Sequence, residues 1–97
     1  MSNDMTGGTF ESMRKLSIGF DLREDRSYDS FFLRLLYLGA EERLPTEWIL
    51  ITSLRVDEIV DDLQKHIDPA DRLLVAQVTS MSYRNLINND KFGRGAA

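Results

Sequence analysis

The sequence of 97 residues contains no cysteine, two prolines and a single histidine. Without cysteine there are no disulfides, thiolate nucleophiles or cysteine-ligated metals, which fits a reducing compartment. The lone His66 excludes a paired-histidine metal site, and a Ser-His-Asp triad would have to use a residue at a predicted helix end. A glycine-rich phosphate loop, a nucleophile elbow and a dinucleotide fingerprint are also missing. Most common enzyme classes therefore lose their usual sequence support.

Long hydrophobic runs are absent as well. No apolar segment reaches the roughly 18 to 20 residues that cross a bilayer. The first residues lack the basic region and apolar run of a secretory signal. We therefore expect a cytoplasmic protein with no membrane partner.

The composition, 42% hydrophobic and 29% charged, is typical of a folded chain, and the length allows one hydrophobic core. We predict a flexible tail over 1–13, one domain over 14–88 and a second tail over 89–97. The net charge of −4 argues against broad attraction to nucleic acid, so any such contact must be local.

The candidate nucleic-acid patch lies near both ends of the first predicted strand. Its members are basic: Arg14, Lys15, Arg23 and Arg26, with Arg43, Arg55 and Arg72 available from other elements. The alternative interpretation is an ordinary mixed, solvated surface.

Apolar and polar residues alternate over 15–22, which predicts a half-buried strand. Gly19 lies within it, and glycine in a strand often marks a close approach by another backbone or a ligand. A helix is predicted from Tyr28 to Leu38, with Ser27 as N-cap and Gly39 as its stop. Its apolar face comprises Phe31, Leu35 and Leu38, flanked by Phe32 and Leu36, and Arg34 marks its exposed side.

The second half continues with a short edge strand over 40–44, a turn or bulge at 45–46 and a buried central strand over 47–54. The apolar spacing over 56–67 predicts an amphipathic helix, and 72–79 is the last core strand. Beyond it, Tyr83, Leu86 and Ile87 predict a docked turn or short helix.

The order β-α-β-β-α-β predicts an α+β, ferredoxin-like sandwich with two helices on one face of a four-stranded antiparallel sheet. The other sheet face has no cover within the chain in this arrangement. We therefore expect a homodimer that forms by sheet-face or edge pairing.

Asp21, at the end of the first strand beside Gly19 and a basic loop, is the candidate metal ligand. Two copies in a two-fold dimer could share one divalent cation such as Mg²⁺. The alternative is an exposed aspartate that caps the following turn. A second group of acids is predicted to lie on a solvated helix face: Asp57, Glu58, Asp61 and Asp62.

Three aromatic residues are candidates for stacking on nucleic-acid bases. Phe31 and Phe32 have core spacing, so we assign them to the core. Trp48 is assigned to the core or to a dimer interface.

The segments IGFDL, EWILITSL, VDEIVDDL and DRLLVAQVT, in this order and spacing, resemble the CRISPR-associated endoribonuclease superfamily. That group includes the small ferredoxin-like adaptation subunit and its stand-alone SinR-like, VapD-like and GhoS-like relatives. The resemblance covers about 15–87 and implies a symmetric homodimer and, in some members, metal-dependent cleavage of RNA or DNA. The family's strand-end Tyr-Asp pair corresponds to Phe20-Asp21, so Asp21 is carried over and the tyrosine hydroxyl is missing. The family's Ser-Val-Phe or Ser-Val-Trp strand signature corresponds to Thr46-Glu47-Trp48, where a charged residue replaces valine.

Three functions follow as alternatives. The first is a metal-dependent phosphodiesterase acting on RNA or DNA, with Asp21 placing Mg²⁺ and Arg14, Arg23 and Arg26 steering the phosphate backbone. The second is a non-catalytic dimeric adaptor or scaffold. The third is a toxin–antitoxin regulator that binds a protein partner through the exposed sheet edge.

Overall fold

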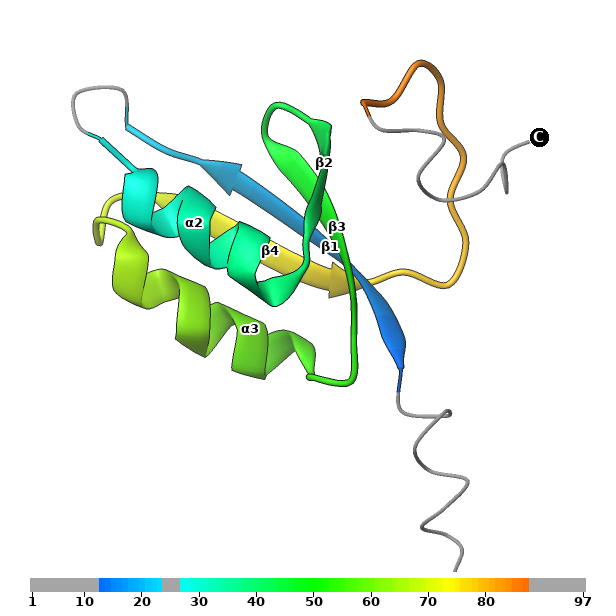
Figure 1. The fold of residues 1–97 in the computed structure, drawn as a ribbon, viewed down its shortest axis with the longest axis horizontal. Helices are drawn as coiled ribbons and strands as arrows, with labels where there is room; N and C mark the ends of the chain where they lie inside the picture. The colour runs from blue at the N-terminus through cyan, green and yellow to red at the C-terminus, as the bar shows by residue number, and fades with distance from the viewer. Residues whose placement is uncertain (1–12, 24–26, 88–97) are drawn as a thin grey trace, which may run out of the picture.

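The computed structural model describes residues 13–23 and 27–87, and its elements form one sheet with two helices in front of it (Figure 1). In chain order they are β1 (Arg14–Asp21), α2 (Asp29–Leu38), β2 (Glu41–Leu44), β3 (Glu47–Thr52), α3 (Val56–Leu63), the short 3₁₀ helix η1 (Gln64–His66) and β4 (Arg72–Gln77). The sheet is antiparallel in the order β2-β3-β1-β4. This is the predicted ferredoxin-like α+β fold.

The core lies between the helices and the sheet because β1 alternates as the sequence predicts. Leu16 and Ile18 are fully buried beneath the helices. Phe20 packs edge-to-face on two aromatic rings of α2, with ring centroids 5.0 Å from Phe31 and 5.7 Å from Phe32. Trp48 of β3 is 7% exposed and joins the same cluster. Its position in the core decides between the two roles that the sequence allows.

Helix α2 ends at Gly39 as predicted, but its N-cap differs from the prediction. The N-cap is Tyr28, not Ser27. The Ser27 hydroxyl accepts a hydrogen bond from the Asp29 N–H at 3.4 Å, so it supports the first turn from one residue farther out. Gly39 ends the helix in the left-handed region, at φ +96°, where glycine carries no Cβ penalty.

The apolar face of α2 is narrower than predicted. Phe31 and Leu35 are buried, whereas Leu36 is 59% exposed. Each helical residue is rotated by about 100° from the one before, which turns Leu36 away from the sheet. Leu33 and Tyr37 lie on the same exposed side.

The open face of the sheet, opposite the helices, is partly covered by the chain itself, which corrects the prediction of no cover. The segment after β4, residues 78–87, folds back on β2 and β3; of the two predicted forms, a docked turn or a short helix, it contains no helix. The Ile87 N–H donates to the Arg43 carbonyl at 2.9 Å, and Arg43 Nη1 donates to the Ile87 carbonyl at 2.8 Å. Ile49, which faces this side, is consequently 4% exposed.

Candidate functional site

The candidate site lies on the open face, where β1 ends. Asp21 is paired in register with Arg72 of β4, and Arg72 Nη1 lies 3.2 Å from Asp21 Oδ2. The two side chains are 70% and 82% exposed, respectively. Together with Gly19 and Leu74 they line a shallow hollow of about 240 Å³. A carboxylate, a guanidinium and an exposed apolar side chain therefore meet at one place.

Gly19 lines this hollow with backbone atoms alone, since it has no side chain. A Cβ atom built at Gly19 would meet Thr46 O at 3.9 Å, an ordinary van der Waals contact. The described part of the chain therefore contains no close contact that requires glycine there. In register beside Gly19 lies Leu74, which is 69% exposed. The arrangement leaves room for another molecule to approach the strand.

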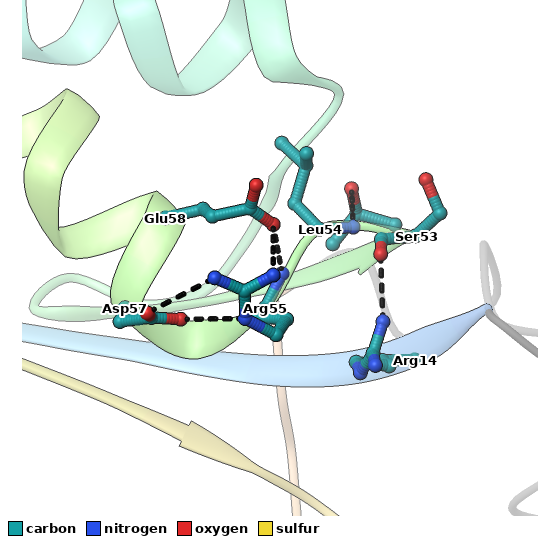
Figure 2. A network of polar contacts seen from close by, with 7 residues as sticks. Arg14, Ser53, Leu54, Arg55, Asp57 and Glu58 are labelled. Atoms are coloured by element: carbon teal, nitrogen blue, oxygen red, sulfur yellow. Dashed lines mark hydrogen bonds and ion pairs between the residues drawn. The ribbon is translucent and has the colours of Figure 1, made fainter.

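The predicted basic patch is divided between the two ends of β1. Arg14 and Asp21 are the first and last residues of an eight-residue strand, which separates them by about 23 Å. Arg14 donates from Nη1 to the Ser53 carbonyl at 2.6 Å, next to the turn that leads into α3 (Figure 2). Lys15 lies at the same end, on the open face opposite Ile51. Neither residue is part of the Asp21 hollow.

Arg23 is the predicted basic residue that lies nearest to Asp21 in the chain, in an exposed position just beyond β1. Its backbone N–H donates to Asp71 Oδ1 at 2.9 Å, which fixes the chain as it leaves the strand. Arg26 lies outside the described residues. Of the additional arginines, Arg72 is at the site, but Arg43 is 2% exposed beneath the C-terminal segment and is not a surface cation.

Three of the four acids of α3 contact arginines. The Arg55 guanidinium lies 3.1 Å from the Asp57 carboxylate. The Glu58 carboxylate accepts a hydrogen bond from the Arg55 backbone N–H at 2.8 Å (Figure 2). The Arg55 guanidinium lowers the pKa of Asp57 through a hydrogen bond. Asp62 is half-buried and bound to Arg34, which corrects its predicted place on a solvated face. Within the described ranges, no three His, Cys, Asp or Glu side chains form a metal-binding group.

His66 has a partner that spacing alone did not indicate. Its Nδ1 lies 2.5 Å from Ser30 Oγ, which joins the end of η1 to the first turn of α2. A catalytic triad also requires a carboxylate bound to the imidazole. The nearby Asp62 carboxylate instead accepts from Arg34 with both oxygens. The contact therefore serves to connect the two helices.

Sequence reasoning identified Asp21 and Gly19 but missed Arg72 as their neighbour. The signal was present, because the first and last strands of this β-α-β-β-α-β order lie side by side. The register that opposes Asp21 to Arg72 depends on packing across the whole sheet, which a single sequence does not specify.

Comparisons with protein-family models, with curated proteins and with solved structures give no match for this chain. Among residues 13–23 and 27–87, no helix combines the length and apolarity that crossing a membrane requires. The site must therefore be interpreted from its own chemistry.

Proposed function

We propose that the protein is a homodimeric, nucleic-acid-associated protein that resembles the CRISPR-associated endoribonucleases and cleaves RNA or DNA phosphodiesters with a divalent metal ion. The observation that carries the proposal is the position of Asp21. Its exposed carboxylate lies on the open sheet face, in a hollow beside Gly19 and Arg72. That face also holds the apolar residues that a second copy would cover.

Dimerisation through the open face is supported by its side chains. Ile51 of β3 is 45% exposed and Leu74 of β4 is 69% exposed, on either side of the central strand β1. A stable pair usually buries about 800 Å² on each partner. A two-fold axis through this face would place both Asp21 hollows at the same interface.

A metal ion fits the chemistry of Asp21. Mg²⁺ is commonly held by one or two carboxylates together with water and substrate phosphates, so one exposed carboxylate from each subunit is sufficient. Asp21 is the residue that would hold the ion, which would supply charge stabilisation at a phosphate. Arg72, 3.2 Å from the carboxylate, adds a guanidinium suited to binding phosphate oxygens.

The test is a cleavage assay with labelled single-stranded RNA and DNA in Mg²⁺ or Mn²⁺. Asp21→Ala should reduce cleavage to background with little change in melting temperature, because the side chain is exposed. Asp57→Asn is the matched control, since Asp57 is also an exposed acid paired with an arginine. Cleavage by Asp21→Ala at the wild-type rate would remove the assignment.

The second candidate is a non-catalytic dimeric adaptor, and the Asp21–Arg72 ion pair itself favours it. Arg72 already neutralises the one carboxylate at the site, as in an ordinary cross-strand charge pair. A wild-type protein that leaves RNA and DNA intact across metals and pH, yet sediments as a dimer, would support the adaptor.

A further inference from the structure

The open edge of the sheet at β4 is a place where another strand can bind. In the strand order, β4 is terminal and pairs with β1 alone among the described strands. The Val78 N–H donates to the Lys15 carbonyl at 2.8 Å. Because antiparallel bonding alternates along a strand, this places the backbone groups of Leu73, Val75 and Gln77 on the outer side. Such an edge is a template for strand addition.

A groove accompanies this edge. Helix α3 runs alongside β4 on the side away from β1 (Figure 1). Between the two elements lies a hollow of about 390 Å³, whose apolar lining is Val60, Ile67, Pro69 and Leu73. Leu73 belongs to both features, since its backbone faces the edge and its side chain lines the hollow. A strand added to β4 would therefore direct alternate side chains into the groove.

The rim of the groove is acidic. Asp68 and Asp71 line it at the turn before β4. The Asp71 carboxylate is held in place by the Tyr28 hydroxyl at 2.6 Å and the Asp68 N–H at 2.8 Å. A bound segment would therefore be favoured by positive charge near its apolar residue.

The charges also decide between two occupants. Pairing of β4 with β4 of a second copy would bring two α3 helices side by side. Four of the eight residues of α3 are acidic and none is basic, so two such helices close together would repel each other. A basic segment of another protein has no such conflict.

We propose that the groove between β4 and α3 binds an extended segment of a partner protein by strand addition to β4. The segment places an apolar side chain against Val60 and Leu73 and a basic side chain at the acidic rim. The proposal is independent of the reaction proposed for Asp21, because that hollow opens on the other face of the sheet.

The direct test uses the full chain and the heptapeptide Thr-Lys-Thr-Val-Thr-Lys-Thr, acetylated and amidated at its ends. Its valine and lysines share one face of a strand. Titration followed by ¹H-¹⁵N spectra should shift the amides of Leu73, Val75 and Gln77 and that of Val60. A peptide with glutamate in place of both lysines should bind at least tenfold more weakly. Shifts confined to the open face, or no binding up to about 1 mM, would overturn the proposal.

Two N-methylated peptides test strand pairing without altering the protein. Methylation of the alternate amides that face β4 should abolish binding, whereas methylation of the other set should leave it within about threefold. Equal binding of both would contradict strand addition. In the protein, Asp68→Asn, at the rim of the groove, should weaken binding several-fold, while Asp29→Asn, an exposed acid on α2, should not; an equal effect of both would count against the acidic rim.

A complementary variant is Val75→Pro. The Val75 N–H points away from β1, so proline leaves the internal strand ladder complete and removes one outer donor. Binding should fall at least tenfold. Wild-type affinity in Val75→Pro would contradict the proposal, and if the variant does not fold, the N-methylated pair decides the question. Without peptide, concentration-dependent shifts of the outer-edge amides of Leu73, Val75 and Gln77 would point to a second copy as occupant and would also overturn the proposal.

Discussion

Arg34 and Asp62 join the two helices through a bidentate pair, with Nε to Oδ1 and Nη2 to Oδ2 both at 2.7 Å. Arg34 comes from the middle of α2 and Asp62 from the last turn of α3, and both side chains are partly buried. Planar guanidinium and carboxylate groups match in this geometry, which fixes orientation as well as charge. The pair therefore connects α2 and α3 in a defined geometry.

The first prediction is that this pair makes stability depend on acid pH. The Arg34 hydrogen bond lowers the pKa of Asp62 below its ordinary value of about 3.9. A carboxyl whose pKa is lower in the folded protein contributes stability above the ordinary pKa and loses it as pH falls through the folded value. Urea unfolding of wild type and Asp62→Asn should therefore differ most at neutral pH and converge toward pH 2. A constant difference across this range would contradict the pairing.

The second prediction compares neighbouring leucines of α2. Leu35 is fully buried and Leu36 is 59% exposed. Leu35→Ala should lower the free energy of unfolding by about 2–5 kcal/mol. Leu36→Ala should change it by about 0.5 kcal/mol or less. Chemical denaturation measures both, and similar losses would mean that the helix is rotated differently on the sheet.

The third prediction concerns the C-terminal segment. Ile87→Pro removes the N–H that bonds to the Arg43 carbonyl, which should cost about 1 kcal/mol. Amide hydrogen exchange over 81–87 should accelerate, and Ile49 on β3 should become more accessible. The control is Ser80→Ala, a substitution at an exposed position of the same segment. Unchanged exchange in Ile87→Pro would show that the segment is held by other contacts.

The fourth prediction uses Gly19. Because a Cβ at this position meets only an ordinary contact, Gly19→Ala should leave the melting temperature unchanged or slightly raised. If a second molecule approaches the strand there, the same substitution should weaken that association. Thermal melting and concentration-dependent sedimentation separate the two effects. A large loss of stability would contradict the open space beside β1.

Much of the fold could be predicted because local patterns agree with the global arrangement. The alternation around Ile18 and the stop at Gly39 each depend on a few neighbouring residues, and both appear where expected. The spacing around Leu86 predicts that the segment 78–87 docks, but its place over Ile49 could not be predicted, because it rests on contacts such as Ile87 with Arg43 between residues 44 positions apart. Long-range contacts of this kind leave no periodic signal.

The candidate site divides in the same way. Asp21 was identified from its place at a strand end. The described residues of the predicted basic patch lie near both ends of β1, as expected, so Arg14 is separated from Asp21 by the length of the strand. The groove beside β4 depends on how α3 packs at the edge of the sheet. The sequence of α3 or of β4 alone does not predict it.

Sedimentation equilibrium of the wild-type protein, beside Leu74→Glu and Leu33→Glu, tests the proposed dimer most directly. Leu74 is exposed on the open face and Leu33 is exposed on α2, so the two charges are placed on opposite sides of the molecule. The wild type and Leu33→Glu should have twice the 11.2 kDa mass of the chain, and Leu74→Glu should have the mass of one chain. A monomeric wild type, or a Leu74→Glu variant that remains dimeric, would contradict pairing through the open face.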